Sequence, residues 1–337
     1  MSFKESSEAV FSESPGKIAF RKLKKDKRSL VALTILFSVI VLSFAAPIYA
    51  KYIAHTDPFK SNLNGTISIN GKDVQLLQPS TTGLGLGVTP IGPTWNPTKY
   101  FLGSDSQGRD VAARLLYGGR STLIIGTSAG LLCVLLSLLI GIFAGYRRGW
   151  LDSVLSRLLD IIWAFPVYLL AISLSVVLLT SGLSFGFIHF GPGSFALPIF
   201  IIGIVYIPYV ARPIRAQVLA LREREFVRAA IGTGAKHSTI VFREIFPNVM
   251  PSVIVFIPII VSLSMLTESA LSFLSIGVQP PAASWGTIIN DGLALLYTRP
   301  FVGIAPGLMI VLTAAALNLY GDAVRDAMDP KSRGRAE

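Results

Sequence analysis

Residues 121–146, STLIIGTSAGLLCVLLSLLIGIFAGY, carry no charged side chain. A helix of about 20 apolar residues crosses a bilayer, so this run is long enough to form one membrane span. Further uncharged runs occupy residues 29–50, 161–211, 245–267 and 300–321. The run 161–211 is more than twice the length of one span, and Gly, Pro, Ser and His residues at 180–198 suit a connection between two helices. The sequence therefore predicts six membrane-spanning helices, at about 29–50, 121–145, 156–180, 197–219, 248–274 and 301–321.

The overall composition supports this interpretation. The chain has 337 residues, of which 52% are hydrophobic and 15% charged. Soluble domains carry about 25% charged residues, so this chain has too few charges to cover a surface that faces water on all sides. We expect an all-α, polytopic membrane protein.

The distribution of Lys and Arg predicts the orientation. Of the 30 basic residues, eight lie in 1–28, three in 146–157, seven in 212–247 and four in 321–337. Short basic segments stay in the cytoplasm, whereas a long segment such as 51–120 crosses largely regardless of its charge. Both termini are therefore expected on the cytoplasmic side of the cell membrane. Nucleic-acid binding is disfavoured despite the net charge of +11, because the basic residues are scattered over four segments.

The chain is expected to divide into five parts: a basic cytoplasmic tail at 1–28, a first span at 29–50, an extracytoplasmic insert with an interfacial helix at 51–118, a five-helix core at 119–321, and a cytoplasmic tail at 322–337. Within the insert, Ile67 and Ile69 alternate with polar residues, as do Val74 and Leu76, and Asn-Gly at 70–71 separates them. Asn-Gly between alternating strands predicts a β-hairpin. Asp105 is the expected cap of a short helix over 111–117.

Residues 222–251, REREFVRAAIGTGAKHSTIVFREIFPNVMP, place charges and glycines between two apolar runs. We interpret the loop 220–247 as a docking element for a separate soluble protein. Small side chains let a helix lie close to a partner, and glycines let the chain turn. The small residues are Ala229, Ala230, Gly232 and Gly234.

Charged residues and a proline frame this loop. Glu225 and Arg228 are three residues apart, so they are expected to pair across one helical turn. Pro247 is expected to end the loop, and Asn248 to cap the following span.

The sequence shows no set of residues that would form an enzyme active site, so no catalytic residue is assigned. Residues 232–238 do not meet the phosphate-loop pattern, which predicts that the chain does not hydrolyse ATP itself. Residues 126–130 fit G-x-S-x-G around Ser128, but they fall in an apolar helix where small residues favour close packing. The histidines at 55, 189 and 237 are far apart, and no metal site is expected.

Glu268 is a charged residue inside an apolar stretch, and a carboxylate in mid-bilayer costs about 2.5–3.5 kcal/mol on insertion scales. One interpretation is that Glu268 lines a translocation path together with Ser269 and Ser272. The other is that Glu268 is a helix-end carboxylate bonded to those serines or to backbone. Both interpretations stay open.

The loop resembles the EAA motif of ABC importer permeases, E-A-A-x3-G-x9-I-x-L-P. Here the motif reads Arg228-Ala229-Ala230, three residues, Gly234, nine residues, and Glu244-Ile245-Phe246-Pro247. Arg228, Glu244 and Phe246 depart from it, and the spacing is kept.

Three further stretches are similar to the C-type permease subunit of the dipeptide/oligopeptide/nickel ABC importer family. The first is Gly103-Ser-Asp105-x-x-Gly108-Arg109-Asp110-Val111. The second runs from Glu268 to Gly286, with Ser275 where glycine is usual, and the third from Gly321 to Pro330. The resemblance covers about 100–333 and a similar first span at 20–50, whereas 51–100 has no counterpart that we can place.

The resemblance implies a six-span, type I permease that pairs with a second homologous permease. It also implies two cytoplasmic ATPases that hold ATP and Mg and bind the loop at 222–247, and an extracytoplasmic substrate-binding protein. This chain itself would bind no cofactor. Di- or oligopeptides are the expected substrates, with nickel chelates or glutathione-like molecules as alternatives. An ion-coupled secondary transporter and an intramembrane enzyme built on Ser128 are the competing classes.

Overall fold

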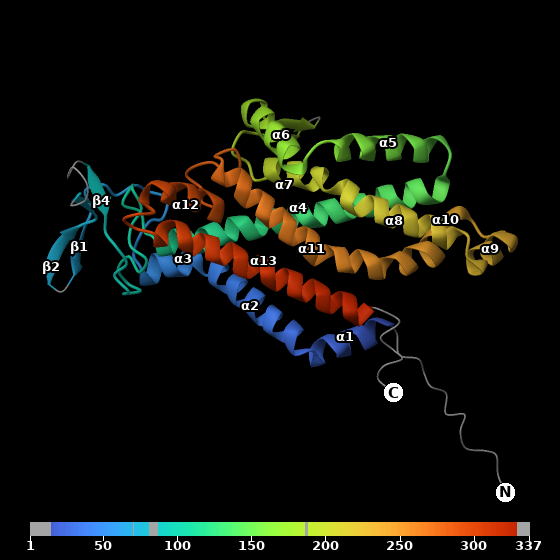
Figure 1. The fold of residues 1–337 in the computed structure, drawn as a ribbon, viewed down its shortest axis with the longest axis horizontal. Helices are drawn as coiled ribbons and strands as arrows, with labels where there is room; N and C mark the ends of the chain where they lie inside the picture. The colour runs from blue at the N-terminus through green and yellow to red at the C-terminus, as the bar shows by residue number, and fades with distance from the viewer. Residues whose placement is uncertain (1–14, 70, 81–86, 186–187, 329–337) are drawn as a thin grey trace, which may run out of the picture.

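The computed structural model describes residues 15–69, 71–80, 87–185 and 188–328. The molecule is a long helical bundle with the small strands of the insert at one end (Figure 1). The N-terminal helices are α1 (Pro15–Lys25), α2 (Lys27–Phe44), α3 (Ala46–Ile48) and the π-helix η1 (Tyr49–Ile53). The core helices are α4 (Val111–Arg147), α5 (Trp150–Ala164), α6 (Val167–Ser181), α7 (Ala196–Val205), α8 (Ile207–Arg222), α9 (Glu225–Gly232), α10 (His237–Thr239), the π-helix η2 (Ile240–Ile245), α11 (Phe246–Phe273), α12 (Trp285–Gly292), the 3₁₀-helix η3 (Leu293–Leu295) and α13 (Phe301–Met328).

The membrane-spanning segments agree with the predicted polytopic all-α fold. Within the described residues, four segments are long and apolar enough to cross a membrane: α2, α4, the continuous stretch from α10 through α11, and α13. Two helix pairs meet the same test together but are bent, α5 with α6 by 93° and α7 with α8 by 44°. The count reaches the predicted six if each bent pair forms one span.

Prolines account for the two bends. Phe165 ends α5 with extended backbone angles, as expected for a residue before proline, and Pro166 then precedes α6. Pro208 lies in the first turn of α8, where a missing N–H is tolerated, and Tyr206 joins it to α7. The segments 156–180 and 197–219, each predicted as one helix, therefore each consist of two.

α4 forms the centre of the bundle and packs against α7, α8 and α11. Its glycines make this contact close. A Cβ atom built at Gly126 would lie 2.2 Å from Cγ of Met265, and one at Gly141 would lie 2.6 Å from Cγ2 of Ile214. The G-x-S-x-G sequence is thus part of a helix-packing face inside α4, as the small residues indicated.

The insert contains the predicted hairpin. β1 (Thr66–Ile69) pairs antiparallel with β2 (Lys72–Gln75), and Ile67 faces Val74. Gly71 has φ +77° in the turn, and Asn70 lies outside the described residues. A second antiparallel pair joins β3 (Leu77–Pro79) to β4 (Val88–Pro90), and a third joins β5 (Leu183–Phe185) to β6 (Ile188–Phe190) in the connection between α6 and α7.

The predicted short helix at 111–117 and its cap are wrong. Those residues are the first two turns of the continuous α4, and the cap is Asp110 rather than Asp105. The Asp110 carboxylate accepts hydrogen bonds from the backbone N–H groups of Ala112 (2.9 Å) and Ala113 (3.2 Å). The Asp105 carboxylate instead accepts hydrogen bonds from the backbone N–H groups of Gln107 and Arg109 and from Arg109 Nε.

The ends of the chain differ from the expected boundaries in one respect. The last helix, α13, continues to Met328 and includes the first residues of the segment predicted as a tail. Residues 1–14 and 329–337 lie outside the described residues. They hold half of the first predicted tail, more than half of the second, and the end of the third family stretch.

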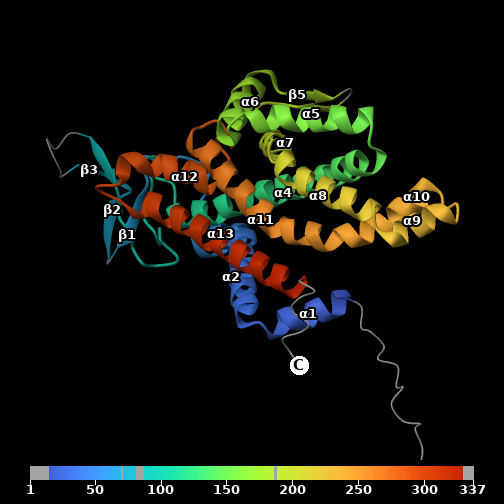
Figure 2. The ribbon, with the colours of Figure 1, turned by 45° about the vertical axis from the view of Figure 1, so that its right-hand side comes forward.

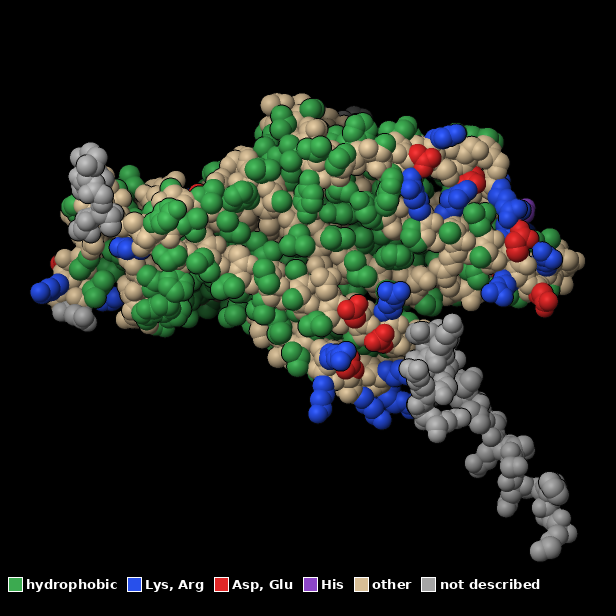
Figure 3. All heavy atoms as spheres, viewed as in Figure 1, with side chains coloured by type: hydrophobic (Ala, Val, Ile, Leu, Met, Phe, Trp, Pro, Cys, Tyr) green, Lys and Arg blue, Asp and Glu red, His purple; other side chains and the backbone are tan. Residues whose placement is uncertain are grey.

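Apolar side chains cover the middle of the molecule, and charged side chains gather toward the end formed by α9, α10, α1 and the close of α13 (Figure 3). Figure 2 shows the same arrangement after rotation, with α9 and α10 projecting beyond the bundle. The strands of the insert occupy the opposite end (Figure 1). This distribution is the one expected for a protein whose middle lies in lipid.

Candidate functional site

The loop predicted to dock a soluble partner forms a projecting helical hairpin. α9 leads into a turn at Gly234, which has φ +75°, and α10 follows. The N–H of Ala235 donates to the carbonyl oxygen of Ala230 (3.0 Å), and the N–H of Gly234 donates to that of Ile231 (3.0 Å). A left-handed glycine just after a helix closes it in this way because glycine has no Cβ to clash.

The hairpin is anchored on one side and open on the other. Val227 and Ile240 are buried in the main apolar core. Phe226, Ile231 and Phe242 are exposed, the last to 69%. Apolar side chains of this size at the tip of a projecting hairpin indicate a surface that a partner covers.

Small residues complete this surface, which we call the coupling face and define as Phe226, Ala229, Ile231, Gly232, Gly234 and Phe242. Ala229 is exposed, and among the described residues no atom outside the adjoining stretch of chain lies within 4 Å of a Cβ built at Gly232 or Gly234. Ala230 instead packs against the apolar core. The structure therefore places three of the four predicted small residues on the exposed side, where they leave room for a partner's backbone.

The ion pair predicted within this loop is wrong. Arg228 binds Glu223 at 3.1 Å rather than Glu225. Glu223 also binds Arg148 at 2.7 Å, and the hydrogen bonds from Arg228 and Arg148 lower the pKa of the Glu223 carboxyl group. Glu225 begins α9, whereas Glu223 lies just before the helix, where both arginines can reach it.

Pro247 lies at the start of α11, where the loop was predicted to end, but the helical structure is continuous across it. Helical structure continues from His237 to Phe273, and the π-helical η2 precedes the proline. Pro247 lies in the first turn of α11, where a residue without an N–H group is tolerated. Asn248 does not cap the helix, because its side-chain amide donates to the carbonyl oxygen of Glu244 (2.6 Å).

Glu268 lies inside the protein and is fully buried. Its carboxylate accepts hydrogen bonds from Ser272 Oγ (2.7 Å) and Ser269 Oγ (3.4 Å). Thr122 of α4 and Ser284, the N-cap of α12, are polar neighbours of the same carboxyl group. Two serine hydroxyl groups of α11 therefore bind the carboxyl group, and two further hydroxyl-bearing residues, from α4 and the start of α12, lie beside it.

The backbone around this cluster is tightly packed. A Cβ at Gly277 would lie 2.4 Å from Ser272 Oγ, and one at Gly286 would lie 2.2 Å from the carbonyl oxygen of Ser269. Ser272 Oγ also accepts a hydrogen bond from the N–H of Val278 (3.0 Å). The stretch from Glu268 to Gly286 thus joins α11, α4 and α12, which favours the structural interpretation of Glu268. The role of Glu268, Ser269 and Ser272 in a translocation path stays a prediction.

A pair of variants tests that role. Glu268→Gln keeps the volume and an acceptor oxygen, so we expect the protein to fold and substrate uptake to stay near normal. Glu268→Ala leaves buried hydroxyl groups without their acceptor, at about 1–3 kcal/mol for each unsatisfied group, and should reduce the amount of folded protein. Uptake and thermal unfolding of both variants are the measurements. Lost uptake in a normally folded Glu268→Gln variant would show that the path needs the charge.

The family motif before α4 fastens the insert to the bundle. Asp105 is buried and accepts hydrogen bonds from Arg109 Nε (2.7 Å) and from the N–H of Gln107 (2.9 Å). Asp291 of α12 accepts hydrogen bonds from Arg109 Nη2 (2.9 Å) and Arg114 Nη2 (2.8 Å). We call these residues, Asp105, Arg109, Arg114 and Asp291, the outer clamp.

Two glycines of the same motif permit close backbone contact. Gly103 has φ +85°, and a Cβ there would lie 2.6 Å from the carbonyl oxygen of Ile91. Gly108 has φ +71°, and a Cβ there would lie 2.2 Å from the carbonyl oxygen of Asn62. Any other residue at these positions would have an unfavourable left-handed backbone conformation, and its Cβ would clash with the neighbouring carbonyl oxygen. These two costs explain why glycine occupies both positions.

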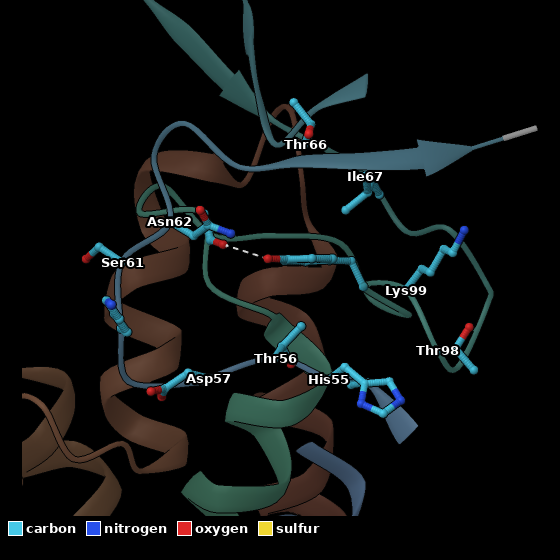
Figure 4. Close-up of a pocket in the computed structure, with 13 residues that line it drawn as sticks. His55, Thr56, Asp57, Ser61, Asn62, Thr66, Ile67, Thr98 and Lys99 are labelled. Carbon is cyan, nitrogen blue, oxygen red and sulfur yellow. Dashed lines mark hydrogen bonds between the residues drawn. The ribbon is translucent and has the colours of Figure 1, made fainter. Parts of the chain in front are cut away.

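A polar hollow opens on the insert, which the sequence did not predict (Figure 4). Its volume is about 430 Å³, and its walls come from residues 54–62, β1 and the turn at 98–100. Tyr100 is buried beneath it and donates a hydrogen bond to the carbonyl oxygen of Gly108 (3.2 Å), and burial raises the pKa of Tyr100. Lys99 Nζ donates to the carbonyl oxygen of Ser68 (2.9 Å). The hollow can receive a polar group at the end of the molecule opposite the coupling face.

Comparison with known proteins gives two family matches. Residues 137–334 match the family described as binding-protein-dependent transport system inner membrane component. Residues 14–68 match the N-terminal TM domain of oligopeptide transport permease C. The second match reaches into the insert, so the likeness extends beyond the stretches that the motifs indicated.

Individual relatives cover nearly the whole chain. The dipeptide transport system permease protein DppC of Alkalihalophilus pseudofirmus is 32% identical over 321 residues, 95% of this chain and 91% of the relative. The oligopeptide transport system permease protein OppC of Bacillus subtilis is 32% identical and covers 94% of this chain and 90% of its own length. The glutathione transport system permease protein GsiD of Pectobacterium atrosepticum is 37% identical over 69% of this chain and 73% of its own length.

A solved structure shares the fold. An inward-facing conformation of the MetNI methionine ABC transporter aligns with a TM-score of 0.50 and 17% identity. The alignment covers 64% of this chain and 96% of that chain. The helical core is therefore an ABC importer permease fold, to which this chain adds segments of its own.

Proposed function

Because the chain belongs to the family of binding-protein-dependent transport system inner membrane components, we propose that it is the permease subunit of an ATP-driven importer of di- and oligopeptides. The observation that carries the peptide class is the match to dipeptide and oligopeptide permeases over nine-tenths or more of both chains. A second, peptide-like candidate is glutathione, which the GsiD relative supports.

The coupling face supplies the proposed attachment to the energy source. Two partner ATPases that hold ATP and Mg would each seat against the loop of one permease, and a second, homologous permease would complete the path. Motion of the ATPases then reaches the bundle through the projecting hairpin. A helix seated in a groove transmits such motion as a rigid element. The exposed apolar side chains and the open glycines support this assignment.

The proposed orientation places the coupling face and both termini in the cytoplasm. The charged end of the molecule holds α9, α10, α1 and the close of α13, whereas the insert and its polar hollow lie at the other end (Figures 1 and 3). An extracytoplasmic binding protein would deliver substrate at that insert end. The predominance of Lys and Arg in the segments at the charged end supports this side as the cytoplasmic one.

Reconstitution tests the function directly. The chain would be purified together with its membrane neighbours, placed in vesicles with the binding protein, and supplied with a labelled peptide library. We expect peptide accumulation that requires ATP. Competition by glutathione or by a nickel chelate would distinguish the alternative substrates. Uptake that persists without ATP or ATPase subunits, driven by an ion gradient, would contradict the proposal and favour a secondary transporter.

A further inference from the structure

We propose that the coupling hairpin and the cytoplasmic end of α4 are locked into one mechanical unit, with Tyr146 as the positioning residue. This inference rests on the proposed function as an ATP-driven permease. The hairpin is continuous in the chain with α8 and α11 but not with α4. Only side-chain contacts can therefore carry its motion directly into α4, the helix at the centre of the bundle.

The first contact joins α4 to α10. The phenolic oxygen of Tyr146, in the last turn of α4, is hydrogen-bonded to Nδ1 of His237 at 2.7 Å, across 91 positions of sequence. The two rings also meet edge to face, with centroids 5.8 Å apart. Tyr146 is buried in the main core, so its hydroxyl group has a fixed position from which to hold His237.

The same tyrosine is held by α8. Arg222, the last residue of α8, donates a hydrogen bond from Nη1 to the carbonyl oxygen of Tyr146 (2.8 Å). Its guanidinium carbon also lies 5.8 Å from the centre of the Tyr146 ring. The final carbonyl groups of a helix lack partners within the helix and favour positive charge. Arg222 meets both needs, so α4, α8 and α10 converge on Tyr146.

A second contact lies beside the first. Arg148, the C-cap residue just after α4, binds Glu223, which in turn binds Arg228 of α9. These side chains are exposed, and exposed ion pairs contribute little to stability. The buried tyrosine is therefore the stronger link, and the ion pairs add a weaker one beside it.

The geometry explains why two links are needed. A hairpin attached only through the chain at α8 and α11 could swing about those two connections. Contacts between the hairpin and the end of α4 add a third point of attachment, beside α8 and α11, and prevent that swinging motion. The far end of α4 carries Arg114 of the outer clamp, so displacement of α4 reaches the insert end without passing through a loop.

The test uses the complete transporter reconstituted with its ATPases and binding protein. Tyr146→Phe removes one oxygen atom and keeps the ring that packs in the core and faces Arg222. We expect unchanged assembly and unchanged basal ATP hydrolysis, with the ATP consumed per peptide imported rising by about fivefold or more. Tyr297→Phe, at a fully exposed tyrosine near the start of α13, is the matched control and should match the parent.

Further variants separate positioning from folding. His237→Ala should raise the same ratio, and adding Tyr146→Phe to it should have no further effect, because both remove one hydrogen bond. His237→Asn keeps a polar atom near the position of Nδ1 and should restore most of the coupling. An unchanged ratio in Tyr146→Phe, or fully additive effects of the two losses, would overturn the proposal.

A crosslink tests whether the two parts move together. Arg148→Cys and Glu223→Cys would be combined with Cys133→Ser, so that a short bis-maleimide reacts only at the introduced pair. If the hairpin and α4 form one rigid unit, the rate of peptide uptake should be the same before and after crosslinking. A block of uptake on crosslinking, with ATP binding retained, would mean that the hairpin separates from α4 during the cycle and would refute the lock. Neither result bears on whether peptides are the substrate, which the uncrosslinked control measures.

Discussion

Gly234→Trp is expected to reach the membrane in normal amounts and to abolish substrate-stimulated ATP hydrolysis and peptide uptake. Apart from its chain neighbours, no residue that the structure describes has an atom within 4 Å of a Cβ at this position, so the indole ring would extend into space that the partner fills. The backbone at Gly234 has φ +75°, and a left-handed conformation costs a larger residue about 1–2 kcal/mol. That cost is local to an exposed turn and is too small to unfold the bundle.

Two controls separate bulk from backbone strain. Gly234→Asn adds a small side chain that tolerates the left-handed conformation, and it should retain most of the coupling. Gly232→Trp adds bulk to the same face without a positive φ and should also uncouple ATP hydrolysis from transport. Membrane amounts, ATPase stimulation and uptake would be measured for each variant. Normal stimulation in both tryptophan variants would show that the coupling face is not a docking surface.

The sequence was sufficient where local composition determines structure. Long uncharged runs predicted the bundle, and the alternation around Asn-Gly predicted the hairpin of β1 and β2. The glycines of α4 were correctly interpreted as packing residues because their helical context was clear. These features depend on neighbours in sequence, and hydrophobicity and turn preference report on such neighbours directly.

Breaks and continuities of helices were harder to predict. Pro166 ends a helix and bends the chain, whereas Pro247 sits inside a longer helical stretch. The difference arises from what precedes each proline. A π-helical turn before Pro247 changes the hydrogen-bond spacing, and composition gives no signal for such a turn.

Partners distant in sequence could not be identified from pattern alone. The spacing of Glu225 and Arg228 predicted a pair within one helix, but Glu223 is the partner that the turn before α9 brings into reach. Tyr146 and His237 meet across 91 positions, and Arg114 and Asp291 across 177. Such pairs follow from the packing of α4 against the rest of the bundle. Short stretches of a single sequence do not show which distant residues this packing brings together.

Asp105→Ala is expected to destabilise the protein by about 3–5 kcal/mol, because it removes one partner from a buried ion network. The side chains of Arg109 and Arg114 are only 7% and 3% exposed. Without Asp105 they keep Asp291, whose side chain is 32% exposed and already shared between them. Two buried guanidinium groups with one partly solvated carboxylate carry an uncompensated charge, which the insert can relieve only by opening to water.

The measurement is thermal unfolding of the purified protein, together with protease sensitivity of the insert. Asp73→Ala, on the exposed hairpin, is the matched control and should change neither. Asp291→Asn should have a smaller effect than Asp105→Ala, because water can solvate the arginine side chains near the more exposed position. If Asp105→Ala unfolds like the control, the outer clamp does not hold the insert. The close approach of Gly103 to Ile91 and of Gly108 to Asn62 would then be what holds the insert together.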